Sequence, residues 1–129
     1  MSNAKSNRNP VAGILGQFKE LVGVLAVALC DAGGEPIALV GESGATAALA
    51  NAVRKLVENL PRTGNASPMA DLFEDSDEFS VPRGDGGVNL LLRRVGDDWG
   101  LAAVWTNDAS VDQVRSYAAE TAFRLEAVS

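Results

Sequence analysis

The first third of the chain moves from a helical to a strand-like distribution of apolar residues. From residue 10 to residue 22 apolar side chains stand three or one positions apart, which predicts a helix, and Pro10 suits its first turn. They are Val11, Ile14, Leu15, Phe18, Leu21 and Val22. Residues 24–30 are apolar at every position, which is typical of a strand covered on both faces. Residues 37–40 predict a second strand, and the turn-forming residues 31–36 join the two as a hairpin.

Residues 43–60 carry the strongest helical pattern, and this pattern differs from that of an ordinary surface helix. The apolar stripe ends before Pro61, which cannot continue a helix. It consists of Leu49, Ala52, Val53, Leu56, Val57 and Leu60. The opposite side is rich in alanine in its first half, and charged side chains return later at Arg54, Lys55 and Glu58. One interpretation is that alanine is present because it is the best helix former. The other is that its small side chain lets a second helix approach closely. The pattern leaves both interpretations open.

The second half of the chain predicts three strands and a final helix. Residues 78–83 form a strand that Pro82 confines to the edge of a sheet. Residues 88–95 and 99–105 are two further strands joined by a short turn. A last helix is predicted after residue 110, because apolar positions recur on one side of this segment. These positions are Val111, Val114, Ala118, Ala122 and Leu125. Ser110 suits its N-cap. The main elements therefore follow the order α-β-β-α-β-β-β-α.

Acidic residues gather between the second helix and the third strand. A short helical turn is predicted at residues 67–71, with Ser67 as its cap and Pro68 at its first position. The carboxylates in and after this turn are Asp71, Glu74, Asp75, Asp77 and Glu78. Such a run is usually a solvated surface, and otherwise it is a contact site for a basic partner.

The composition describes one globular domain and excludes several classes of partner. The 129 residues are 47% hydrophobic and 22% charged, which suits a single domain over residues 10–128. Residues 1–9 are polar, and we leave them out of the predicted fold as a tail. The net charge of −6 argues against nucleic acid as a partner, because phosphate binding needs a basic surface. Since no apolar run is long enough to span a membrane, we expect no membrane insertion and a cytoplasmic protein.

Few side chains in this sequence could support catalysis or hold a metal. The chain has no His and one Cys, which excludes Ser–His and Cys–His nucleophiles, imidazole metal sites and zinc–thiolate clusters. The carboxylate pairs Glu74–Asp75 and Asp97–Asp98 fall in predicted loops, without the apolar surroundings that tune an acid or base. Cys30 ends a predicted core strand, so we expect an inert apolar side chain. We therefore expect no enzyme, no catalytic residues and no cofactor or metal.

Three segments resemble the Roadblock/dynein light chain family. Residues 21–38 (LVGVLAVALCDAGGEPIA) are similar to that family's first hairpin, in which an apolar strand runs into Asp-x-x-Gly and x-Pro-Ile-Ala. Residues 99–105 resemble its last strand and residues 111–125 its closing helix, and the likeness covers residues 10–128. The resemblance implies an α/β fold, more specifically an α+β sandwich. Its five-stranded antiparallel sheet carries the second helix on one face and the first and last helices on the other.

The resemblance also implies a function. Family members dimerise through the second helix and third strand, and they are non-catalytic scaffolds or regulators of small Ras-like GTPases or of related signalling and motor assemblies. The alanine-rich helix and the edge strand of this chain agree with such a homodimer. The predicted dimer interface consists of Ala45, Ala48, Ala52, Phe79 and Val81. The predicted contact surface for a GTPase or signalling protein consists of Asn51, Arg54, Lys55 and Glu58.

A second function stays open alongside the first. Sensor domains of the profilin, PAS and GAF kind also cover a sheet with helices. A small-molecule sensor requires an apolar cavity of roughly several hundred Å³ between sheet and helix. A filled core would instead favour the interaction module.

Overall fold

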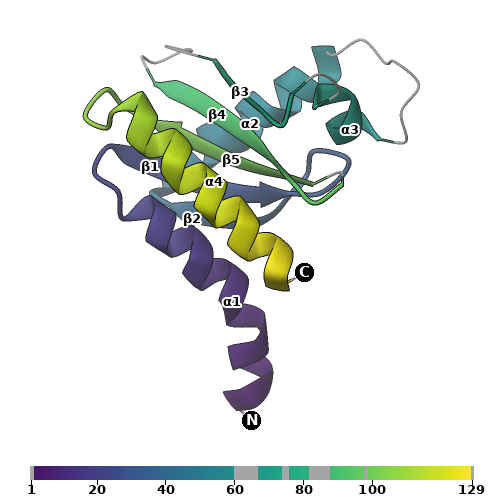
Figure 1. Ribbon diagram of the computed structural model, residues 1–129, viewed down its shortest axis with the longest axis vertical. Coiled ribbons are helices and arrows are strands. Elements are labelled where there is room, and N and C mark those ends of the chain that lie inside the picture. The colour runs from purple at the N-terminus through teal and green to yellow at the C-terminus, as the bar shows by residue number, and fades with distance from the viewer. Residues whose placement is uncertain (1, 60–66, 74–75, 82–87, 98, 129) are drawn as a thin grey trace.

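The protein is built around one five-stranded antiparallel sheet (Figure 1). The computed structural model describes residues 2–59, 67–73, 76–81, 88–97 and 99–128, with side chains from Pro10 onward except that of Phe79. The strands are β1 (Val24–Cys30), β2 (Pro36–Gly41), β3 (Glu78–Val81), β4 (Asn89–Val95) and β5 (Trp99–Trp105). The helices are α1 (Ser2–Lys19), α2 (Ser43–Asn59), α3 (Pro68–Leu72) and α4 (Val111–Val128). The strands lie in the order β2-β1-β5-β4-β3, so β3 is an edge strand as predicted, and β2 is the other edge.

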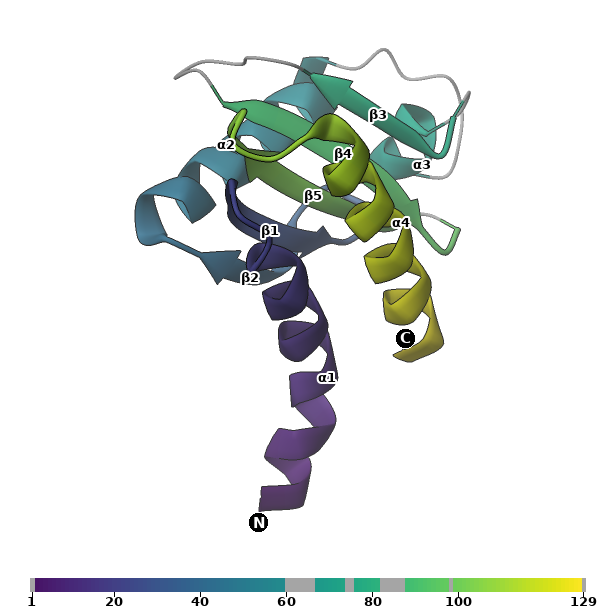
Figure 2. The same cartoon turned by 60° about the vertical axis from the view of Figure 1, so that its left-hand side comes forward.

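Helices cover both faces of this sheet. Helices α1 and α4 lie side by side on one face, and α2 and α3 lie on the other (Figures 1 and 2). This is the predicted sandwich, with the short α3 added beside α2. Two predicted caps are confirmed: Ser67 Oγ accepts a hydrogen bond from the Ala70 N–H at 3.1 Å, and Ser110 Oγ accepts one from the Gln113 N–H at 3.1 Å.

The first helix begins earlier than its apolar pattern indicates. Helix α1 starts at Ser2, so Pro10 lies within the helix and not in its first turn. A proline has no N–H to donate and gives up one helical hydrogen bond at this point. The apolar positions after Pro10 are the ones that hold the helix on the sheet, because Leu15 and Phe18 are fully buried there.

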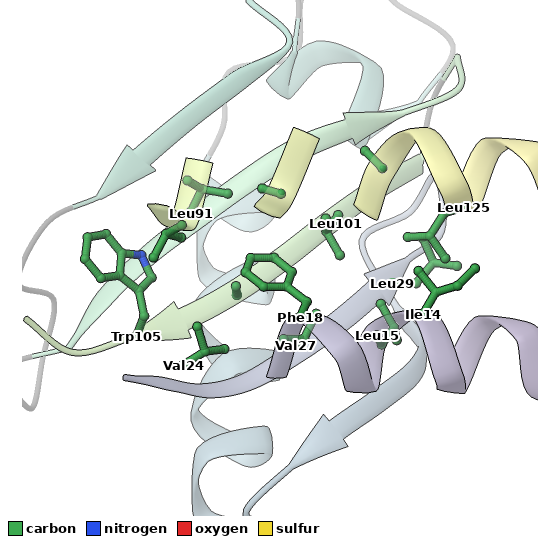
Figure 3. Close-up of a cluster of buried hydrophobic side chains, with 14 of the residues drawn as sticks. Ile14, Leu15, Phe18, Val24, Val27, Leu29, Leu91, Leu101, Trp105 and Leu125 are labelled. Atoms are coloured by element: carbon green, nitrogen blue, oxygen red, sulfur yellow. The ribbon is translucent and has the colours of Figure 1, made fainter. Parts of the chain in front are cut away.

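Apolar side chains fill both sides of the sheet, and β1 contributes to each of them. Val27 and Leu29 face α1 and α4, whereas Ala28 and Cys30 face α2 and α3. The prediction that residues 24–30 are covered on both faces is therefore confirmed. Figure 3 shows the α1–α4 side, where side chains of the two helices converge above the strands. The labelled residues are Ile14, Leu15, Phe18, Val24, Val27, Leu29, Leu91, Leu101, Trp105 and Leu125.

The turn between β1 and β2 connects the sheet to α2 and α3. The Asp31 Oδ1 atom accepts two backbone hydrogen bonds within this turn, both at 3.0 Å. Gly34 has a φ of +88°, and a Cβ atom there would come within 2.8 Å of Val57 Cγ2 on α2. Glycine is therefore required by both the backbone and the packing. The carbonyl of Ala32 accepts a hydrogen bond from the Met69 N–H at 2.9 Å, which fixes the start of α3.

One carboxylate of the acidic run joins three elements. Glu78 of β3 accepts a hydrogen bond from Arg93 Nη1 of β4 at 3.0 Å and another from Arg115 Nε of α4 at 2.6 Å. The Glu78 side chain is only 12% exposed, and Asp71 is buried. The expectation of a solvated run is wrong for these two residues, whereas Asp77 is well exposed. Glu74 and Asp75 lie outside the described residues.

We predict that Glu78→Gln lowers the free energy of unfolding by about 1 kcal/mol. The variant keeps the size of the side chain but removes the charge shared by two arginines that are themselves partly exposed. Urea denaturation followed by circular dichroism measures the change. Asp77→Asn is the matched control, since its 3.5 Å pair with Arg94 is exposed, and it should leave stability unchanged. Equal losses of unfolding free energy in the two variants would contradict the conclusion that Glu78 joins β3 to β4 and α4.

Candidate functional site

A groove runs between helix α2 and the β3 edge of the sheet. Its volume is about 380 Å³, and its walls come from α2, β3, β5 and the start of β4. We call it the α2–β3 groove. Its lining residues are Ala48, Asn51, Ala52, Lys55, Leu56, Asn59, Val81, Val88, Leu90 and Val104. Most of these side chains are apolar, and the polar ones all come from α2.

The shape of the groove follows from the side chains on two sides of α2. Leu49 and Val53 are fully buried and hold the helix against the sheet. On the side that faces β3, the helix presents the small side chains of Ala48 and Ala52. Alanine fills little volume, so the space above the sheet stays open there. The alanine-rich pattern therefore creates a concave apolar surface beside an edge strand.

The structure brings together three of the five residues predicted for a dimer interface. Ala48, Ala52 and Val81 all line the α2–β3 groove. Ala45 instead packs against the core cluster beneath α2. Phe79 belongs to β3, and its side chain lies outside the described part of the chain.

The four residues predicted to contact a partner are all exposed on α2, at the spacing i, i+3, i+4 and i+7 that shares one side of a helix. Asn51 and Lys55 line the groove, whereas Arg54 and Glu58 are exposed on α2 outside its lining. Arg54 Nη1 donates a long hydrogen bond of 3.4 Å to Asn51 Oδ1. The set is therefore continuous along α2, and two of its four members also line the groove.

In the comparisons with known proteins, only solved structures match this chain. No protein-family model and no curated protein matches the sequence. Among solved structures, MglB of Myxococcus xanthus superposes with a TM-score of 0.69 at 17% identity, over 93% of this chain and 87% of that one. An MglB structure with a tetrameric arrangement gives a TM-score of 0.69 at 16% identity, over 95% and 89%. A Roadblock/LC7 domain from Streptomyces avermitilis gives 0.60 at 14% identity, over 90% and 91%. The chain has a Roadblock-type fold.

Several residues that shape the groove in this Roadblock-type fold were not found from the sequence. Leu56 belongs to the predicted apolar stripe, and Asn59 lies one helical turn after Lys55 on the groove side. Spacing along α2 could have placed both residues beside Ala52. Leu90 and Val104 gave no such signal, because both are buried strand residues and their place in the groove lining depends on where α2 lies across β4 and β5.

The groove is lined mainly by apolar side chains. Lys55 is its only charged lining residue in the described part of the chain. In the same ranges, no three Asp, Glu or Cys side chains come together in a way that could hold a metal ion. None of the helices described there has an apolar run long enough to cross a membrane.

Cys30 is buried in the core beneath α2. Burial raises the pKa of its thiol from 9.0 to about 12, and the nearby charges of Asp31 and Glu35 add to the shift. The folded chain thus keeps the thiol protonated at pH values where the unfolded chain ionises it.

We predict two measurable consequences for Cys30. The native thiol should not react with a maleimide at pH 8, whereas the chain in urea should react readily. Between pH 9 and pH 12 the unfolded chain loses the thiol proton and the folded chain retains it, so stability falls as pH rises, by about 1.4 kcal/mol per pH unit. Comparison with Cys30→Ala isolates this slope from other titrations. An equal slope in Cys30→Ala and the wild type would contradict the prediction.

Proposed function

We propose that the protein is a non-catalytic homodimeric interaction module that works in the cytoplasm. In the dimer, α2 of each chain packs into the α2–β3 groove of the other, and the two β3 edges face each other. The observation that carries this proposal is the groove itself, since it gathers Ala48, Ala52 and Val81 beside an edge strand. An exposed edge strand next to an apolar surface can extend a sheet across a two-fold axis.

Two further points support a second copy as the occupant of the groove. The groove and the β3 edge lie on the same side of the molecule, so one two-fold contact covers both. One structural neighbour, an MglB, was solved with a tetrameric arrangement. Sedimentation equilibrium at micromolar concentration tests the proposal, and we expect the mass of two chains. A single-chain mass under these conditions would overturn it.

The partner of the dimer is proposed to be a small Ras-like GTPase or a related switch protein, as the resemblance to the Roadblock family implies. Dimerisation places two α2 helices next to each other and covers the groove residues Asn51 and Lys55. Arg54 and Glu58 lie outside the groove and stay available on the outer side of α2. We therefore assign the partner contact chiefly to this pair.

A capture experiment tests the GTPase assignment. Immobilised protein is exposed to native lysate with excess GDP or with a non-hydrolysable GTP analogue, and bound proteins are identified by mass spectrometry. The matched variant is Arg54→Glu/Glu58→Lys, which preserves the net charge and the i, i+4 pairing while reversing each charge. We expect the wild type to capture a GTP-binding protein in one nucleotide state and the variant to lose it. Absence of any GTP-binding protein in both states would contradict the assignment.

The volume of the groove also favours a second candidate function. About 380 Å³ of mainly apolar space lies within the range of small-molecule sites, as the sensor alternative requires. Native mass spectrometry of freshly purified protein distinguishes the two functions. A stoichiometric small molecule retained by single chains would support the sensor, whereas ligand-free dimers would support the interaction module.

A further inference from the structure

The apolar surface of the α2–β3 groove continues down to the sheet. Leu90 of β4 and Val104 of β5 line the groove, although they are only 6% and 3% exposed, so they form its floor. Val81 and Val88 stand on the side of the strands, and Leu56 stands on the side of α2. An alkyl chain that enters the groove therefore exchanges water for apolar contacts along its length.

The polar lining residues all belong to one wall of the groove. Asn51, Lys55 and Asn59 follow one another at intervals of four residues along α2, so they share one side of the helix. All three side chains are exposed. The other lining residues among those described are Ala, Leu or Val. The groove is therefore amphipathic, with an apolar floor and one polar wall.

Lys55 gives this polar wall its charge. Within the described residues, the Lys55 ammonium takes part in no hydrogen bond or ion pair. An ammonium has three donors and no acceptor, so it prefers an anionic partner. The nearest charged residues along the helix, Arg54 and Glu58, are exposed outside the groove lining. The charge that the groove offers to a ligand is thus positive.

We propose that the α2–β3 groove binds an amphipathic anion of the alkyl carboxylate class. The alkyl chain lies along Leu90 and Val104, and the carboxylate meets the ammonium of Lys55 in a charge-assisted hydrogen bond. Asn51 can add a second hydrogen bond, because Arg54 bonds its Oδ1 atom and leaves its NH₂ group as a donor. The groove volume of about 380 Å³ suits a single small molecule of this kind.

The consequence for assembly rests on the proposed homodimer. In that dimer the second copy covers the same groove that the alkyl carboxylate would fill, so the two occupants exclude each other. A ligand that binds only the single chain favours single chains by mass action. The alkyl carboxylate would therefore regulate the dimer by dissociating it.

Three probes with the same alkyl chain test the site on the full protein. They are octanoate, octylammonium and octanol, which differ in the charge of the head group at neutral pH. Nuclear magnetic resonance of the isotope-labelled chain follows the amide signals of Leu90 and Val104 during each titration. We expect octanoate to shift these signals and to bind at least tenfold tighter than octylammonium. Because the net charge of the chain is −6, general adsorption would instead favour the cation.

A charge reversal identifies the residue that selects the anion. Lys55→Glu should reverse the preference, so that octylammonium binds tighter than octanoate. Lys19→Glu is the matched control, because it makes the same change of charge on α1, on the other face of the sheet, and it should preserve the preference. Circular dichroism checks that both variants are folded. Equal binding of the three probes to the wild type, or no shift with octanoate at millimolar concentration, would overturn the proposal.

Sedimentation equilibrium separates this proposal from the proposed dimer. We expect saturating octanoate to raise the dissociation constant of the dimer at least tenfold, and octylammonium to leave it unchanged. Dimers that form without a probe and persist while octanoate shifts Leu90 and Val104 would reject the regulation. Single chains in the absence of any probe would reject the dimer, and the titration would then decide the anion site by itself.

Discussion

Replacing Ala48 by glutamate should convert the proposed dimer to a monomer without unfolding the chain. Ala48 is exposed in the single chain and lines the α2–β3 groove, so a longer side chain is tolerated until a partner helix closes over it. In the proposed dimer the carboxylate would be desolvated in a mainly apolar groove, where Lys55 is the one basic lining residue among those described, and this costs about 3 kcal/mol. The dissociation constant should then rise by more than a hundredfold. Sedimentation equilibrium measures the mass, and circular dichroism checks the fold.

The neighbouring residue provides the control for this experiment. Ala47 is equally small, lies on the same helix and is exposed, but it does not line the groove. Ala47→Glu should therefore leave the dimer intact. Dissociation by both variants would mean that charge on α2 has a general effect, and dissociation by neither would place the interface elsewhere. Either result would reject the groove as the contact.

Truncating Phe18 should remove about 3–5 kcal/mol from the free energy of unfolding. The side chain is fully buried where α1 meets the sheet, among Leu15, Val27 and other members of that core cluster (Figure 3). Its ring also lies near Tyr117 of α4, with ring centroids 6.2 Å apart. Phe18→Ala thus leaves a cavity between both helices and the strands. A domain of this size has about 5–15 kcal/mol of stability in total, so much of it would be lost.

Phe123→Ala is the matched control for the core variant. It deletes the same side chain from α4, where that side chain is 74% exposed, and stability should change by less than about 0.5 kcal/mol. Urea denaturation at protein concentrations where the oligomeric state is constant compares the two variants. Similar losses from both would show that Phe123 is covered by a partner and that the α1–α4 side is an interface.

Most of the fold could be predicted from the sequence, because local apolar spacing records how each element is buried. Residues 24–30 are apolar at every position since β1 lies between two layers of helices. The prediction from Pro82 that the strand before it lies at a sheet edge is confirmed by the position of β3. The caps at Ser67 and Ser110 were predictable for the same reason, since a cap satisfies backbone N–H groups only a few residues away. The start of α1 was missed because residues 2–9 carry no apolar stripe.

The candidate site depends on contacts between distant segments, and these follow only from the tertiary structure. Glu78 looked like part of a solvated acidic run until β4 and α4 brought Arg93 and Arg115 to it. Arg54 and Lys55 are neighbours in sequence, yet the rotation of the helix directs only Lys55 toward the groove. Leu90 and Val104 resemble ordinary buried strand residues, and only the position of α2 over the sheet makes them part of the groove lining. Sequence spacing reports which side of an element is apolar, whereas the distance between two elements determines whether that side is filled or left open.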